Sequence, residues 1–214
     1  KEEFDETLRY WRRLIDKHAV VLRLSARPTP ADLQGFDELV IATGVLPRRL
    51  DIPGADSAKA VTYVGILSGR AAAGKSVAVI GAGGIGFDVA EFLSSPPPDQ
   101  AMNPKHFLAE WGIDAANVGA GGLVPARDDK PNRRIVMLQR KAGRMGRGLG
   151  VSTGWILRLQ LAKRKVAQMT GVTYRSIDAD GLHVTVGTED KTIPAETIVI
   201  CAGGGGIPTM YDPD

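Results

Sequence analysis

The chain has 214 residues, of which 43% are hydrophobic and 24% are charged, a composition that is ordinary for a soluble globular protein. With 27 basic and 24 acidic residues the net charge is only +3, and no basic stripe carries interleaved aromatics, so nucleic-acid binding is not expected. A single cysteine, Cys201, excludes an internal disulfide framework and a cysteine-cluster metal site, and the 3 histidines lack metal-ligand spacing.

The N-terminal part, residues 1–50, predicts a helix and two strands without a glycine-rich phosphate turn. An apolar repeat from Phe4 to Ile15 has helical spacing, which indicates an amphipathic helix resting on a core. The apolar runs at residues 20–24 and 38–44 are typical of strands, and the second run ends in a glycine turn.

The strongest signal is a buried strand, a glycine turn and a helix over residues 75–93. Residues 51–70, with a short helix from residue 61, are predicted to be the linker that leads to it, and the domain begins near residue 71. The run at residues 77–80 is apolar and rich in β-branched residues, as in a parallel strand covered on both faces. The sequence has no run of eighteen apolar residues, so no membrane-spanning helix is predicted.

The turn has the spacing G-x-G-x-x-G, in which each glycine has a physical role. The first glycine permits the tight turn, the second lets the backbone approach a pyrophosphate, and the third lets the helix pack on the strand. Free amides at the helix start favour phosphate. The predicted cofactor-binding turn is Gly81, Ala82, Gly83, Gly84, Ile85 and Gly86.

The next strand, residues 134–139, indicates which dinucleotide binds. Enzymes that use NAD place an acid at the end of this strand, where it binds the ribose 2′-hydroxyl. Here the strand ends in Gln139, Arg140 and Lys141, with Arg144 and Arg147 close behind. Cations at this place favour a 2′-phosphate, so we predict selectivity for NADPH with Arg140 or Lys141 as its ligand. The alternative is a solvated basic loop.

The other segments complete an α/β pattern. Residues 96–132 form an insertion rich in proline and glycine, with one short amphipathic helix. Ser152 or Thr153 caps a helix that is predicted to reach Ala167 or Met169. An antiparallel ribbon over residues 172–193 and a strand at residues 197–201 follow, and residues 204–214 form an irregular tail.

Several motifs resemble a known family. Ala42-Thr43-Gly44, with the proline-rich exit after it, resembles flavoprotein disulfide-reductase-like folds. Nearly the whole chain resembles the C-terminal portion of bacterial NADPH-dependent 2,4-dienoyl-CoA reductases. The matching segments are residues 4–24, 36–47, 76–93, 110–114, 135–141, 148–150, 153–155, 180–184 and 199–203. The insertion is also similar to that of the family.

The resemblance implies an α/β fold: a Rossmann-like NAD(P)-binding domain at residues 71–203 with three-layer ββα and antiparallel-ribbon features, plus the C-terminal part of an FAD-binding domain at residues 1–50. It implies that NADPH gives hydride to FAD, and that electrons pass through a 4Fe–4S cluster to FMN, which reduces 2,4-dienoyl-CoA in unsaturated fatty acid β-oxidation. The FMN, the cluster, the acyl-CoA site and part of the FAD site belong to other domains of the polypeptide.

The same resemblance assigns Thr43, Gly44, Ala202 and Gly203 to cofactor binding. It transfers no catalytic residue, so this portion alone is expected to be inactive, and it implies a cytoplasmic protein that contacts no membrane. The segment after Gly203 departs from the family pattern. Two alternatives stay open: a non-catalytic ADP-binding domain, as in related amine-dehydrogenase flavoproteins, and an NADPH-dependent reductase of another activated alkene.

Overall fold

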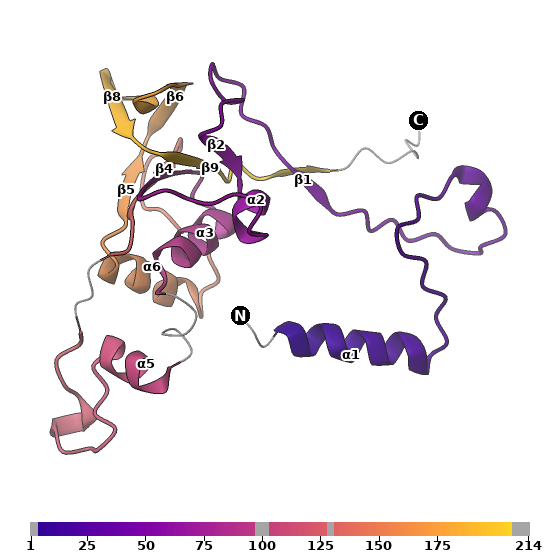
Figure 1. Ribbon diagram of the computed structural model, residues 1–214, viewed down its shortest axis with the longest axis horizontal. Coiled ribbons are helices and arrows are strands. Elements are labelled where there is room, and N and C mark those ends of the chain that lie inside the picture. The colour runs from indigo at the N-terminus through magenta and orange to yellow at the C-terminus, as the bar shows by residue number, and fades with distance from the viewer. Residues whose placement is uncertain (1–3, 97–102, 128–130, 207–214) are drawn as a thin grey trace. The chain divides into compact units, whose positions relative to one another are not determined.

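The computed structural model describes residues 4–96, 103–127 and 131–206. The described residues fall into two compact units, one up to Thr43 and one from Gly44 onward (Figure 1). No helix in the described ranges combines the length and apolarity needed to cross a membrane.

The first unit contains the helix α1 (Phe4–Lys17) and the 3-10 helix η1 (Pro30–Leu33). The predicted helix is confirmed, but Leu8 and Trp11 on its apolar repeat are more than half exposed. The strands predicted at residues 20–24 and 38–44 are wrong, because those residues are extended or turn segments that pair with no strand in the described part of the chain. Their side chains stay in solvent, with Val21 79% and Val40 85% exposed.

The second unit is built on a parallel five-stranded sheet with the order β2-β9-β3-β4-β5. The central strands of this sheet are covered on both faces, so their residues are apolar on both faces. The five strands are β2 (Ala60–Thr62), β9 (Thr197–Ile200), β3 (Ser76–Ile80), β4 (Arg134–Gln139) and β5 (Ala167–Thr170).

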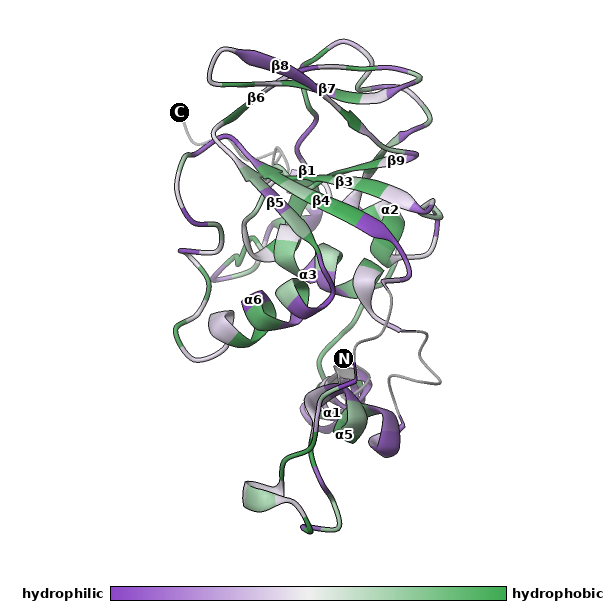
Figure 2. Cartoon of the chain, turned by 90° about the vertical axis from the view of Figure 1, so that its left-hand side faces the viewer, coloured by the Kyte–Doolittle hydropathy of each residue, from purple (hydrophilic) through white to green (hydrophobic). Residues whose placement is uncertain are grey.

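Figure 2 shows three layers, with helices on one face of this sheet and a second, antiparallel sheet on the other. The helices are α2 (Tyr63–Leu67), α3 (Gly84–Ser94) and α6 (Gly154–Lys163). The antiparallel sheet consists of β6 (Val172–Ile177), β7 (Gly181–Val186) and β8 (Glu189–Pro194). The α/β fold with a nucleotide-binding arrangement and an antiparallel ribbon is therefore confirmed.

Two apolar cores separate the layers. Between the helices and the parallel sheet, Phe87, Met137 and Leu161 are fully buried. Between the two sheets, Ile80, Leu182 and Ile198 are fully buried. The parallel sheet is thus held from both sides, which fixes the carboxyl ends of its strands.

Three segments differ from the sequence prediction. Residues 51–70 are not a linker, because β2 pairs with β9 and Ile66 of α2 is buried in the core. The last helix ends at Lys163 and does not reach residue 167, since Lys165 has a φ of +56° and the chain then pairs with β4 as β5. The predicted tail begins with β10 (Gly204–Gly206), which pairs with β1 (Val45–Pro47), whereas residues 207–214 lie outside the described ranges.

The predicted insertion contains the expected short helix, α5 (Pro104–Trp111), and a 3-10 turn, η2 (Ala120–Gly122). Glu110 and Trp111 fasten it to α6: Arg164 contacts the Glu110 carboxylate at 3.2 Å, and the Lys163 ammonium lies 4.3 Å from the centre of the Trp111 ring. Residues 97–102 and 128–130 of the insertion lie outside the described ranges. The described part of the insertion is thus anchored on the helical face.

The hairpin between β6 and β7 makes a pH-dependent contribution to stability. Asp178 accepts hydrogen bonds from His183 Nε2 at 2.7 Å and from the amides of Asp180 and Gly181. The bond to His183, followed by these amides, lowers the pKa of the Asp178 carboxyl. Because the folded-state pKa is depressed, the stabilisation is present above the unfolded-state pKa and is lost as the pH falls through the folded-state value.

We therefore expect the urea midpoint of the wild type to fall, relative to that of Asp178→Asn, as the pH is lowered from about 5 to about 2. Urea denaturation of both proteins across this range measures the difference. Asp180→Asn, whose side chain has no hydrogen bond within the described residues, is the control. Parallel pH profiles for wild type and Asp178→Asn would contradict this account.

Candidate functional site

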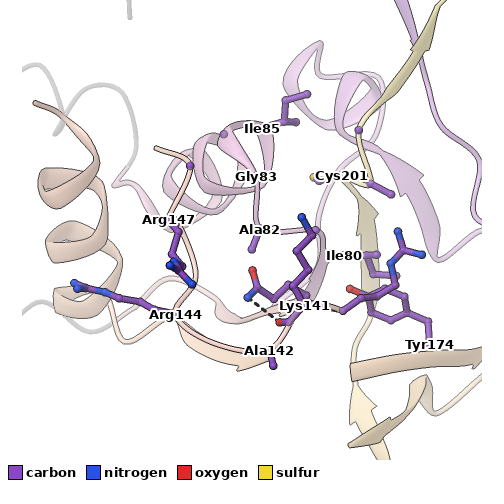
Figure 3. Close-up of a pocket in the computed structure, with 18 residues that line it drawn as sticks. Ile80, Ala82, Gly83, Ile85, Lys141, Ala142, Arg144, Arg147, Tyr174 and Cys201 are labelled. Carbon is purple, nitrogen blue, oxygen red and sulfur yellow. Dashed lines mark hydrogen bonds between the residues drawn. The ribbon is translucent and has the colours of Figure 1, made fainter. Parts of the chain in front are cut away.

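The candidate site is a cavity of about 730 Å³ at the carboxyl ends of β3, β4 and β9. Strand β3 is the point where the sheet order reverses, with β9 on one side and β4 on the other. Ligands of open α/β sheets bind at such a switch point, beyond the carboxyl ends of the strands. The lining comes from residues 80–85, 139–142, 144, 146–148, 174 and 201–203 (Figure 3).

Two glycines of the turn are required by the protein's own backbone. Gly81 has a φ of +108°, and a Cβ there would lie 2.3 Å from the carbonyl oxygen of Cys201. A Cβ at Gly86 would lie 2.0 Å from the carbonyl oxygen of Gly81. The strand end, the turn and the first turn of α3 are therefore packed backbone against backbone.

Gly83, the second glycine, is not required by internal packing. Its φ of −80° is open to any residue, and a Cβ there would have nothing within 4 Å. The protein itself leaves this space open beside the N-terminus of α3, whose first amides have no partner within the helix. A pyrophosphate fits this cradle, because amide donors and the positive end of the helix dipole face it and no side chain blocks it.

The loop after β4 lines the opposite part of the cavity, and we call residues 140–144 the basic turn. Arg140, Lys141, Arg144 and the following Arg147 are exposed, and none of them forms an ion pair or a hydrogen bond through its side chain within the described residues. No aspartate or glutamate is among the described residues that line the cavity. In Figure 3, Arg144 and Arg147 lie on one side of the pocket, with Tyr174 and Cys201 on the other. The cavity therefore carries uncompensated positive charge suited to an anionic ligand.

Tyr174 and Cys201 supply neutral walls. The Tyr174 hydroxyl donates a hydrogen bond to the carbonyl oxygen of Leu138 at 3.0 Å, and burial raises its pKa to about 12 although Arg140 acts in the opposite sense. Burial likewise raises the pKa of the Cys201 thiol to about 12. Because a thiol with this pKa is protonated near neutrality, Cys201 is a buried apolar residue and not a nucleophile.

The structure brings together most of the residues that the sequence predicts for the cofactor. These line the cavity: Gly81, Ala82, Gly83, Gly84, Ile85, Arg140, Lys141, Ala202 and Gly203. Gly86 lies behind the turn in its packing role. Thr43 ends the first unit and Gly44, with a φ of +76°, begins the second, and neither lines this cavity.

Sequence reasoning missed Tyr174, Gly146 and Gly148 as parts of the site. Tyr174 enters from the antiparallel sheet, so its presence depends on how that sheet folds over the end of β4. The two glycines belong to a segment whose spacing matches no phosphate-binding motif. No sequence signal assigns Tyr174 to the site, because that role depends on the contact between the antiparallel sheet and the end of β4.

Comparison with known families agrees with this geometry. The family model for pyridine nucleotide-disulphide oxidoreductases matches residues 10–210. The chain belongs to this family. Pyridine nucleotide-disulphide oxidoreductases are flavin-dependent enzymes that use FAD and NAD(P)H. Cys201 is the sole cysteine of this chain, so a redox-active disulfide cannot form within it.

Individual relatives of this pyridine nucleotide-disulphide oxidoreductase chain are much longer. A metal reductase from Desulforamulus reducens is 26% identical over 184 residues, which cover 82% of this chain and 25% of the relative. A structure of 2-naphthoyl-CoA reductase in complex with 2-naphthoyl-CoA is 24% identical with a TM-score of 0.70 and covers 95% of this chain and 26% of that one. The 6-hydroxypseudooxynicotine amine oxidase of Pseudomonas geniculata N1 is 17% identical with a TM-score of 0.58, covering 91% and 27%. The chain thus spans about a quarter of the length of these proteins.

Proposed function

We propose that this chain is the NADPH-binding portion of a flavoprotein oxidoreductase that reduces 2,4-dienoyl-CoA in the β-oxidation of unsaturated fatty acids. NADPH supplies hydride to FAD, and electrons then pass by a 4Fe–4S cluster and FMN, both held in other domains of the polypeptide, to the dienoyl thioester. The observation that carries the NADPH assignment is the basic turn after β4, which faces the cavity without a carboxylate among its described lining residues.

The charge of the basic turn decides between the two nicotinamide dinucleotides. They differ at the adenosine ribose, which carries a hydroxyl in NAD and a phosphate in NADP. A carboxylate at the end of β4 would bind the hydroxyl and repel the phosphate. A guanidinium or ammonium donates charge-assisted hydrogen bonds to the phosphate. Arg140 and Lys141 follow β4 directly, and Arg144 and Arg147 line the same cavity as further cations.

The remaining cofactor-binding residues would orient the dinucleotide. The amides at the start of α3 bind the pyrophosphate, and Gly83 leaves the room for its approach. Ala202 and Gly203 follow β9 and form the far wall of the cavity. None of these residues exchanges a proton or an electron, so this portion of the enzyme binds and positions while the cofactors carry the redox chemistry.

The proposed acceptor is a conjugated acyl-CoA thioester. The sequence motifs resemble dienoyl-CoA reductases, and the similar 2-naphthoyl-CoA reductase structure contains a conjugated acyl-CoA. The metal reductase relative favours a second candidate, in which electrons from NADPH reach a metal ion. A non-catalytic ADP-binding domain is the alternative that the basic turn disfavours, because ADP lacks the extra phosphate that these cations would bind.

Equilibrium binding of 2′-phospho-ADP-ribose and of ADP-ribose tests the NADPH assignment. We expect the wild type to prefer the phosphorylated ligand by roughly tenfold or more, because a charge-assisted hydrogen bond is worth ~1.5–3 kcal/mol. Arg140→Ala should remove much of this preference, and Arg12→Ala, which changes an exposed arginine of α1, should not. Equal affinities in the wild type would make the basic turn a solvated loop and overturn the assignment.

The acceptor is tested with the full polypeptide. Oxidation of NADPH is followed at saturating 2,4-dienoyl-CoA and, separately, with a soluble ferric chelate. Turnover with the dienoyl thioester supports the proposed function, and turnover with the chelate alone supports the metal-reducing alternative. A full polypeptide that retains ADP and does not oxidise NADPH would leave the non-catalytic domain as the correct assignment.

A further inference from the structure

We propose that Gln139 is a positioning residue that clamps the basic turn in the shape that receives the 2′-phosphate. This inference rests on the proposed NADPH selectivity and adds its structural cause. Gln139 lines the cavity, but its amide nitrogen is hydrogen-bonded to the turn, so on this view the selectivity depends on an uncharged amide that acts through the backbone. The selectivity for the 2′-phosphate therefore depends on the backbone conformation of the basic turn as well as on the charges of its side chains.

The contacts of Gln139 define the clamp. Gln139 is the last residue of β4 and is half-buried. Its Nε2 donates hydrogen bonds to the carbonyl oxygens of Lys141, at 2.9 Å, and of Gly143, at 3.1 Å. The bond to Lys141 is drawn in Figure 3. An amide nitrogen has two donors, so both are used within the turn. Because both acceptors are carbonyl oxygens, only the nitrogen of the amide can face them.

A third hydrogen bond joins the basic turn to the end of β5. The amide of Gly171, directly after β5, donates to the carbonyl oxygen of Lys141 at 3.2 Å. That oxygen therefore accepts from both Gly171 and Gln139. Gly143 has a φ of +90°, a left-handed conformation that closes the turn and favours glycine. The backbone of the turn is fixed between β4 and β5.

The cations of the turn are arranged in the opposite way. Arg140, Lys141 and Arg144 are exposed, with no ion pair or side-chain hydrogen bond within the described residues. A fixed backbone sets where each of these side chains leaves the turn before any ligand arrives, while the cationic ends stay free to bind an anion. Such pre-organisation reduces the ordering entropy that binding would otherwise have to overcome.

A carboxylate at position 139 could not make this clamp. Ionised carboxylate oxygens are acceptors only, so a glutamate there would set two acceptors against the carbonyl oxygens of Lys141 and Gly143. The turn would open, and the added negative charge would also oppose a 2′-phosphate. Glutamine has the same shape as glutamate and has the donors, which explains why an amide ends this strand.

The test compares Gln139→Met with the wild type. Methionine keeps the length of the side chain and removes both donors without adding charge. We expect the preference for 2′-phospho-ADP-ribose over ADP-ribose to fall by roughly fivefold or more, while the affinity for ADP-ribose changes by less than about twofold. Gln139→Glu should reduce the preference further. The matched control is Gln168→Met, an exposed glutamine of β5 outside the cavity.

The outcomes separate the clamp from the proposed function. The clamp is overturned if Gln139→Met keeps the full preference for 2′-phospho-ADP-ribose, or if it loses affinity equally for 2′-phospho-ADP-ribose and ADP-ribose. Either result leaves the NADPH assignment intact. Equal affinities in the wild type overturn the NADPH assignment and this inference with it. Should Gln139→Met fail to fold, side-chain amide exchange in the wild type decides: we expect Gln139 to exchange roughly tenfold more slowly than Gln168, and equal rates overturn the clamp.

Discussion

Replacement of Phe87 by alanine is expected to lower the free energy of unfolding of the nucleotide-binding unit by ~3–5 kcal/mol. The ring is fully buried on α3, between the helix and the parallel sheet. It also reaches the segment after the basic turn, because a Cβ on Gly146 would lie 2.8 Å from Phe87 Cζ. Truncation removes this apolar contact and leaves a cavity that a backbone packed on both sides cannot fill.

Urea denaturation followed by circular dichroism measures this loss. Phe92→Ala is the matched control, since Phe92 lies on the same helix and is 47% exposed, and its loss should stay below about 1 kcal/mol. The Phe87 substitution should also weaken nucleotide binding, because the ring supports Gly146 at the cavity wall. Equal losses for the two phenylalanines would contradict the described packing of α3.

Gly86→Ala and Gly83→Ala are expected to affect different properties of the protein. The new Cβ at position 86 would meet the carbonyl oxygen of Gly81 at 2.0 Å, so backbone must move, and we expect a loss of stability of about 1–3 kcal/mol or more. The new methyl at position 83 meets nothing within 4 Å and should change stability by less than about 0.5 kcal/mol. It should instead weaken dinucleotide binding by roughly tenfold or more, because it fills the open space in which we propose that the pyrophosphate binds.

Denaturation curves and calorimetric titration with NADPH, on both variants, measure the two effects. Since the two substitutions add the same methyl group to the same turn, each is the control for the other. A Gly83→Ala protein that binds NADPH like the wild type would show that the cradle at α3 holds no phosphate. A Gly86→Ala protein of unchanged stability would contradict the close packing of the turn.

The features that sequence reasoning located are those in which local pattern and tertiary structure agree. Residues 77–80 followed by the glycine turn predict the strand and the start of α3 because the hydrophobic period changes there. The ribbon strands alternate as the antiparallel sheet requires. Arg140 and Lys141 line the cavity because they directly follow a strand whose end is fixed by the sheet, and their role as phosphate ligands stays a prediction.

The errors have physical causes as well. Strand β5 has the sequence Ala-Gln-Met-Thr, which continues a helical pattern, and its pairing with β4 overrides that local preference. Strand β2 has three residues and is defined by its partner β9 rather than by its own pattern. The runs at residues 20–24 and 38–44 have strand-like composition, but a strand exists only where a neighbour accepts its hydrogen bonds. Tyr174 could not be assigned because its role arises from contact between layers.

The pairing of β1 with β10 brings the entry and the exit of the second unit together. Val45 lies opposite Gly206, and Pro47 lies opposite Gly204. The intervening residues form a closed module whose two ends leave side by side, as they do in proteins that tolerate the insertion of one domain into another. Such a module can be inserted into another protein as one piece. The two chain ends that the host presents need to lie only as far apart as two neighbouring strands.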